Sequence, residues 1–415
     1  MAKTIILQKT ILYIFTFLYI FNPGNFLNFN LVYVLGFLSL FYLLLNKKYA
    51  IMMLSNKSIF ILFFICLLFF FYLIFFYFFG NTDAILRGYS FLVVWLSIFS
   101  SLAIVGMFKS LYVATIEKFL NFIINVTCIQ IFFVILSIIL PSFRDWVLST
   151  ARQTDILMIS NDAGSGLRSF GLSSGFTSTF PMFMGICAIF SLHMFISKKD
   201  VYEKIKYLII SLFLIFSIIL NARTGLIPVI LFLLILPISI FMKKDFKNII
   251  LLCSFVVILF FLPNINFYNN DYLFRLMQAL EEFDSLSTGK KTGTFEALSN
   301  MWFFPDNTVS ILFGEGVKIV GAFPRGSDIG FIQDVFMFGL IPTVFLSLCL
   351  VYVFSPLFRK IKSYYGVLFF QVFIVSLLFF YMKGVTFYAN EISNLIILML
   401  CFVVFENYLR DKHQS

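Results

Sequence analysis

The sequence predicts an all-α fold: a polytopic transmembrane helical bundle of about twelve spans with two polar loops on one side, the second partly helical. Two observations predict it. Hydrophobic residues make up 61% of the 415 residues, and charged residues only 12%. A soluble fold could not hide so much apolar surface, so lipid must solvate it. We therefore expect a single integral membrane domain over residues 1–415.

Apolar runs of spanning length follow one another along the chain. Each suits a helix, because a helix satisfies its own backbone polar groups in lipid. The clearest run is Ile59–Phe79, in which 18 of the 21 residues are Phe, Ile or Leu. The expected spans lie near 5–22, 28–45, 58–79, 90–108, 116–140, 174–196, 205–220, 226–242, 248–262, 329–355, 364–382 and 392–409.

The basic residues indicate the orientation of these spans. Nineteen of the 30 Lys and Arg residues fall in alternate connections, a set that includes both chain ends. Short loops rich in Lys and Arg stay on the cytoplasmic side, so both termini are expected in the cytoplasm. The net charge of +10 then indicates membrane topology, and no nucleic acid partner is expected.

Arginine is distributed in the opposite sense to lysine. Seventeen of 21 Lys lie on the expected cytoplasmic side, whereas seven of nine Arg lie on the outer side. The planar guanidinium binds phosphate and carboxylate with two parallel hydrogen bonds, so an anionic or sugar-bearing ligand is expected outside. The seven are Arg87, Arg144, Arg152, Arg168, Arg223, Arg275 and Arg325.

Two outer loops are long enough to build a site. The first covers residues 141–173 and becomes rich in Gly and Ser near its end. The second covers 263–328, where apolar residues from Leu273 to Phe283 recur at helical spacing and predict an amphipathic helix. Such a helix can lie on a membrane surface or cover a lumen.

Four of the outer arginines are candidate ligands for an anionic group. Arg223 lies in Asn221–Gly225, the tight connection between two expected spans, where its alternative role is snorkelling or a helix-end salt bridge. Arg168 and Arg325 each precede a span, and Arg275 lies on the amphipathic helix. For these three the alternative is a solvated loop charge.

The acidic residues give fewer candidates. Asp328 stands at the start of an expected span, where it could instead be a helix N-cap. Asp334 lies about two turns deeper and needs a partner or water there. Asp83 and Arg87 have the i,i+4 spacing of a structural ion pair.

Several familiar kinds of site are missing from the sequence. The outer loops hold no Asp-x-Asp motif for a divalent metal, and no glycine-rich nucleotide loop occurs. The only histidines are His193, near a cytoplasmic helix end, and His413 in the tail, so an outer Ser-His-Asp mechanism lacks its base. We expect no metal and no cofactor.

Three stretches resemble a known family. They are Arg168-Ser-Phe-Gly171, then Ala222-Arg-Thr-Gly225, and finally Leu312-Phe-Gly-Glu-Gly316 with Ser327-Asp-Ile-Gly330 and Phe338-Gly-Leu-Ile341. In combination, and in their order along the chain, they resemble the O-antigen (polysaccharide repeat-unit) polymerases of the Wzy type, which are related to the O-antigen ligases.

The resemblance implies a metal-independent glycosyltransferase of the bacterial inner membrane. It would join undecaprenyl-pyrophosphate-linked repeat units at the periplasmic face, where both long loops would then lie, with a chain-length regulator protein as a further partner. Arg168 and Arg223 would stabilise the pyrophosphate leaving group, and Asp328 would be the base, with Glu315 or Asp334 as the next candidates. The substrate-binding candidates are Arg325, Arg275, Glu315 and Asp334. Ligases place a His where this chain has Asp328.

Two other functions stay open. One is a lipid-linked oligosaccharide flippase, which should show related halves and charges along a path through the spans. The other is an O-antigen ligase.

Overall fold

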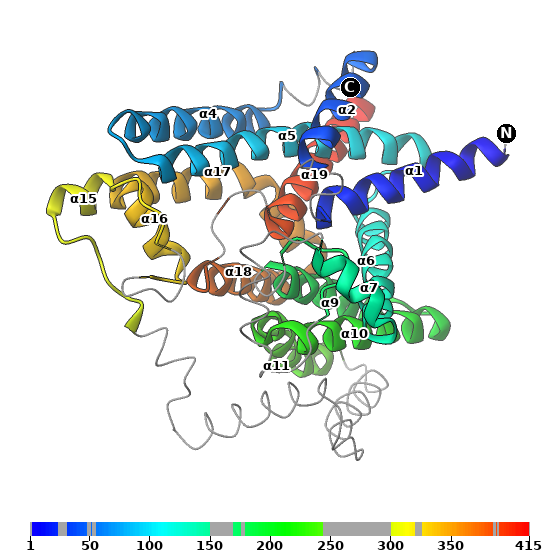
Figure 1. Cartoon of the computed structure of the whole chain (residues 1–415). Coiled ribbons are helices and arrows are strands. Elements are labelled where there is room, and N and C mark those ends of the chain that lie inside the picture. The colour runs from blue at the N-terminus through cyan, green and yellow to red at the C-terminus, as the bar shows by residue number, and fades with distance from the viewer. Residues whose placement is uncertain are drawn as a thin grey trace, which may run out of the picture. The chain divides into compact units, whose positions relative to one another are not determined.

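A computed structural model describes most of the chain. The described residues are 2–23, 31–47, 51, 55–149, 169–175, 179–243, 300–319, 326–384, 387 and 390–414. Every regular element among them is a helix, in agreement with the predicted all-α class (Figure 1).

Most predicted spans coincide with helices. Within the described residues, seven are long and apolar enough to cross a membrane: α1, α4, α5, α6, α9, α17 and α19. Three shorter apolar helices are α2, α11 and α18. The bounds are α1 (Ala2–Phe21), α2 (Leu31–Leu45), α4 (Lys57–Phe78), α5 (Thr82–Leu111), α6 (Ile116–Ile139), α7 (Pro141–Ser149), α9 (Thr179–Ser197), α10 (Val201–Asn221), η3 (Arg223–Gly225, a 3₁₀ turn), α11 (Leu226–Lys243), α15 (Thr308–Phe313), α16 (Gly330–Phe338), α17 (Leu340–Tyr365), α18 (Val367–Met382) and α19 (Glu391–Gln414).

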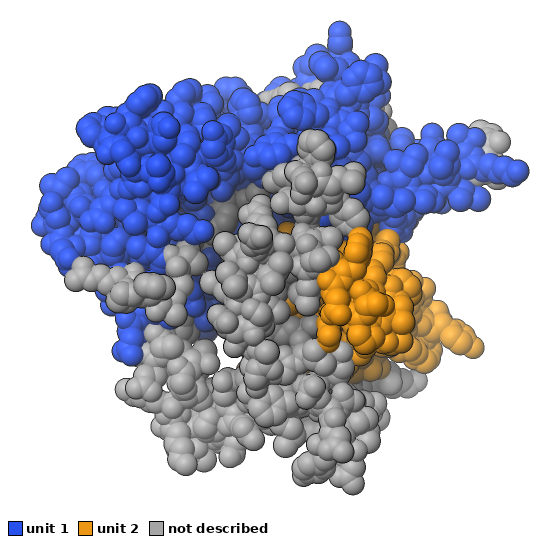
Figure 2. Space-filling view, viewed as in Figure 1, with its two compact units in different colours: residues 1–122, 296–364, 378–415 blue, residues 123–295, 365–377 orange. Residues whose placement is uncertain are grey.

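The chain groups into two compact units, coloured separately in Figure 2. Unit 1 comprises residues 1–122, 296–364 and 378–415, and unit 2 comprises 123–295 and 365–377. This grouping does not test the single membrane domain expected from the sequence, which stays a prediction.

Helix α5 is the centre of unit 1. It packs against α1, α2, α4 and α19, and its buried face carries many small residues. Gly106, for example, lies against the ring of Tyr42 on α2. Small residues let helices approach closely in a membrane, where packing replaces the hydrophobic effect as the driving force.

Helix α9 is the centre of unit 2. It packs against α10, α11 and η3, and nearly its whole length is buried. Gly185 on α9 lies against the carbonyl of Gly225 in η3, so a side chain at either glycine would meet backbone. The connection that carries Arg223 is therefore held tightly against α9.

The structure corrects the prediction at the expected span 329–355. That stretch is not one helix: α16 ends at Phe338, Gly339 adopts a φ of +87°, and α17 starts at Leu340. The first outer loop contains α7, which the sequence analysis missed. The expected span 248–262 and the amphipathic helix lie outside the described residues.

Candidate functional site

The backbone around Arg223 is fixed by Asn221, the last residue of α10. Its side-chain nitrogen donates to the Ser169 carbonyl at 2.6 Å and to the Ser217 carbonyl at 2.7 Å, and Asn221 is 1% exposed. Ser169 directly follows Arg168. Two stretches singled out in the sequence, 52 residues apart, are thus joined by one buried hydrogen bond.

The segment after Arg168 is also tied to α6. Ser169 Oγ donates to the Val134 carbonyl at 2.8 Å, and Gln130 Nε2 donates to the Phe170 carbonyl at 2.6 Å. Gln130 Oε1 accepts from the Leu172 backbone at 3.3 Å. A buried polar group in a membrane helix requires such partners. Two side-chain amides, those of Gln130 and Asn221, thus hold the segment at Ser169. We call these three residues the amide cluster.

A glycine lets this segment lie so close to α6. Gly171 has a φ of +55°, and a Cβ there would crowd the Gln130 amide and the Val134 backbone nitrogen. The amide cluster therefore positions the backbone within and just after the Arg168 motif and just before the Arg223 motif. The structure describes Arg223 through its backbone in η3, and Arg168 lies just before the described segment.

In unit 1, the third resembling stretch folds back on itself. Gly314, after α15, and Gly339, after α16, both have positive φ, and their backbones touch. The Tyr72 hydroxyl on α4 donates to the Phe313 carbonyl at 2.6 Å or the Phe338 carbonyl at 3.0 Å. The two Gly-containing motifs, distant in sequence, thus form one glycine crossing.

A buried ion pair joins α5 to α16. Arg87 Nη2 donates to Asp334 Oδ1 at 2.9 Å, and the two side chains are only 13% and 4% exposed. The Tyr381 hydroxyl donates to Asp334 Oδ2 at 3.1 Å. Asp334 therefore has the partners its depth requires, and both its oxygens are bonded within unit 1. Arg87 was predicted to pair with Asp83, but its carboxylate partner in the structure is Asp334.

Asp328 and Glu315 lie at opposite ends of α16. The Glu315 backbone donates to the Phe336 carbonyl at 2.8 Å, near the end of the helix. Asp328 precedes its start, eight residues before Phe336, which corresponds to roughly 12 Å along a helix. The structure therefore does not bring these two candidate bases together.

Asp328 is not the N-cap of α16. The cap position is Ile329, whose backbone nitrogen donates to Ser327 Oγ at 3.1 Å. Helix α16 therefore begins without a side-chain cap, and the Ser327 hydroxyl accepts only from the residue at the cap position. Asp328 is half-buried, and no described side chain hydrogen-bonds its carboxylate.

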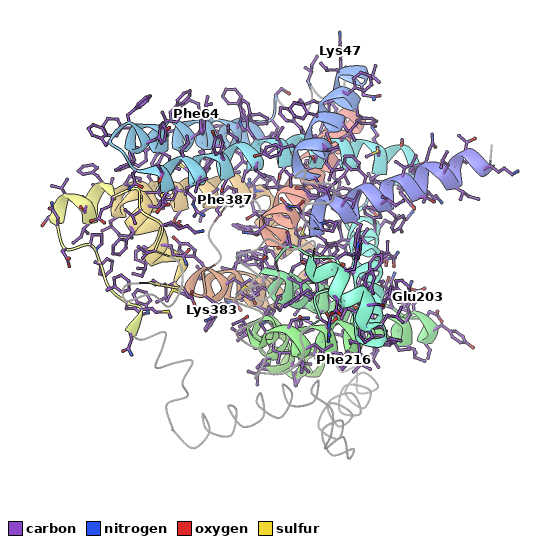
Figure 3. The ribbon with its side chains drawn as sticks, in the orientation of Figure 1. Lys47, Phe64, Glu203, Phe216, Lys383 and Phe387 are labelled. Atoms are coloured by element: carbon purple, nitrogen blue, oxygen red, sulfur yellow. The ribbon has the colours of Figure 1, made fainter. Side chains whose placement is uncertain are left out.

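Three segments meet at Asp328. Its backbone nitrogen lies 3.4 Å from Met301 Sδ, and Ser327 Oγ donates to the Met301 carbonyl at 3.0 Å. On another side, Gly384 packs against the Asp328 carbonyl. Lys383 precedes that glycine at the end of α18 (Figure 3). Arg325 and Arg275, the other binding candidates, lie outside the described residues.

The residues that position these candidates were not predicted from the sequence. Gln130 did leave a signal, since it is an amide near the middle of a predicted membrane span. Asn221 precedes the Arg223 motif, but nothing local shows that its partner is Ser169. Tyr381 gave no signal at all.

Comparison of the chain with known protein families, with curated proteins and with solved structures found no match.

Proposed function

We propose that the chain is a membrane glycosyltransferase that polymerises lipid-linked oligosaccharide repeat units, as its resemblance to the O-antigen polymerases implies. The observation that carries the proposal is the hydrogen bond between Asn221 and Ser169. It ties the backbone next to Arg168 to the helix end two residues before Arg223. The two motifs that the resemblance makes catalytic are thereby parts of one buried arrangement.

The chemistry assigned to these motifs is charge stabilisation. A hydroxyl of the acceptor glycan attacks the anomeric carbon of the donor glycan. The bond from that carbon to the phosphate oxygen breaks, and undecaprenyl pyrophosphate leaves with the electron pair. Arg168 and Arg223 stabilise the developing phosphate charge, because guanidinium binds phosphate oxygens bidentately.

Asp328 is the base in this proposal. It would take the proton of the acceptor hydroxyl, and its carboxylate accepts no hydrogen bond from a described side chain. Glu315 stays the second candidate, at the other end of α16. Asp334 is a poorer ligand for substrate, because Arg87 and Tyr381 already bond its two oxygens.

The remaining expectations complete the proposal. Arg325 and Arg275 hold the lipid-linked substrates at the periplasmic face of a bacterial inner membrane, where a chain-length regulator would also act. The chain crosses that membrane about twelve times, with both termini in the cytoplasm. The excess of basic residues in alternate connections, 19 of 30, supports this topology.

Polymerisation by the purified protein tests the proposal. The protein is mixed with lipid-linked repeat units, with and without EDTA, and the products are separated on a gel. We expect a ladder of chain lengths that survives EDTA. Arg223→Ala should lower the rate by about 100-fold or more, the cost of removing one charge-stabilising donor. Arg223→Lys should recover only part, because lysine lacks the bidentate fork.

Arg144→Ala is the matched control. Arg144 is also an outer arginine, on α7, but its partner at 3.4 Å is the exposed Asp145, so its loss should leave the ladder unchanged. If authentic substrate gives no ladder with the wild type, the polymerase proposal is wrong. Transbilayer movement of the same lipid would then test the flippase alternative.

A further inference from the structure

We propose that Trp302, together with Asp328 and Lys383, forms a subsite for one pyranose ring of a glycan. The inference rests on the proposed function, because it gives the substrate's sugar part a place in unit 1. It is drawn from three features that the proposed catalytic roles do not explain. They are an exposed tryptophan, the aromatic rings packed against it, and a lysine that precedes the glycine in contact with Asp328.

The aromatic part of this subsite is a row of three rings. Trp302 is 46% exposed, and its ring lies 6.5 Å from that of Phe331 at an angle of 37°. Phe331 in turn meets Tyr381 edge-to-face at 6.4 Å. Rings packed in this way hold one another in place, so Trp302 offers a firm apolar surface.

The neighbours of Trp302 are anchored as well. Met301 and Phe303 pack on the buried cluster formed by Ile329, Ile332 and Phe336. The Ser327 hydroxyl also binds the Met301 carbonyl, as described above. The tryptophan therefore stands between two fixed residues and does not need to be ordered by a ligand, which lowers the entropic cost of binding.

Two residues with polar side chains adjoin the segments that carry these rings. Asp328 lies against Met301, and the turn at Lys383 and Gly384 lies against Asp328. Lys383 is half-buried, and neither its ammonium nor the Asp328 carboxylate has a hydrogen-bond partner among the described residues. A carboxylate that can accept and an ammonium that can donate thus belong to residues whose backbone lies next to the neighbours of Trp302.

A pyranose ring matches this combination. The axial hydrogens of one sugar face pack on an aromatic ring, while hydroxyls around the rim donate to a carboxylate and accept from an ammonium. A lipid chain would leave both charged groups unpaired, at a cost in free energy. A free phosphate would meet the like charge of Asp328. The chemistry favours a hydroxyl-rich ring.

Tryptophan fluorescence can test the subsite, because the chain has three tryptophans. The double variant Trp95→Phe/Trp146→Phe leaves only Trp302. The matched control, Trp95→Phe/Trp302→Phe, leaves Trp146. This side chain is 43% exposed, and its ring centroid lies 5.6 Å from that of Phe143. Both proteins are placed in lipid nanodiscs and quenched with acrylamide. The added probes are methyl pyranosides and the oligosaccharide released by acid from the lipid-linked substrate.

We expect at least one probe to reduce acrylamide quenching of Trp302 by about twofold, while leaving that of Trp146 unchanged. Adding Asp328→Asn should raise the half-saturating probe concentration by about fivefold or more, because a charged acceptor is replaced. If no probe protects Trp302 more than Trp146, the subsite proposal is wrong. Quenching of Trp302 by brominated lipid would then identify it as an interfacial anchor.

The result is independent of the polymerisation assay. Protection of Trp302 without polymer from the wild type would keep the subsite and remove the proposed function. Polymer from the wild type without protection would remove the subsite alone.

Discussion

The two units hold their candidate residues by different chemistry. In unit 1 two charged side chains, Arg87 and Asp334, form a buried ion pair with each other. In unit 2 the amide cluster is neutral and binds backbone. Neutral amides are less costly to bury than charges, and their bonds do not depend on ionisation. Unit 2 therefore holds the backbone at the Arg168 and Arg223 motifs through neutral groups.

The largest effect should come from breaking the ion pair. Asp334→Ala leaves Arg87 buried without its carboxylate, which should cost about 3–5 kcal/mol of stability. The midpoint of thermal unfolding in detergent measures it.

A double variant sharpens this test. Arg87→Met/Asp334→Leu replaces both charges with apolar groups of similar size and should recover most of the loss, since such exchanges are often neutral. If the double variant is as unstable as Asp334→Ala, the pair contributes more than mutual neutralisation, and the contrast with the amide cluster is weaker.

The glycine crossing should give the next largest effect. A Cβ at Gly339 would strike the backbone of Gly314 and Leu312, and the φ of +87° is itself unfavourable for alanine. Strain and overpacking together should make Gly339→Ala cost about 2–4 kcal/mol. Gly80→Ala is the control, because Gly80 has a φ of +90° but open space around it. Equal losses of stability in the two variants would show that the close approach is unimportant.

The smallest of the three effects is expected in the amide cluster. Asn221→Leu leaves the Ser169 carbonyl without its donor, which should cost about 1–3 kcal/mol. Thermal unfolding again measures the loss, and the polymerisation rate should fall with it. Asn46→Leu is the control: that amide donates to the Tyr42 carbonyl of its own helix at 2.9 Å and joins no second segment. A cost at Asn46 as large as at Asn221 would contradict a positioning role for Asn221.

The sequence predicted the helices better than it predicted what joins them. Apolar runs encode spans locally, so α4, α6 and α9 could be found from composition alone. The break at Gly339 was missed because an apolar run continues across it, and Gly314, whose backbone lies against it, is 25 residues earlier. The Asn221–Ser169 bond likewise joins separate segments. The candidate residues could be chosen from their residue types and their expected side of the membrane. Their hydrogen-bond partners could be identified only from the folded structure.

Helix α4 shows what the Tyr72 hydroxyl contributes beyond one hydrogen bond. Most residues of α4 itself are Phe, Ile or Leu, so the helix has no polar face that would set its rotation about its own axis. Tyr72 selects one rotation by donating to the carbonyls of Phe313 and Phe338, which lie 241 and 266 residues further along the chain. During synthesis these acceptors emerge long after α4 has entered the bilayer. The two hydrogen bonds of Tyr72 can therefore form only after the ribosome has made residues far along the chain.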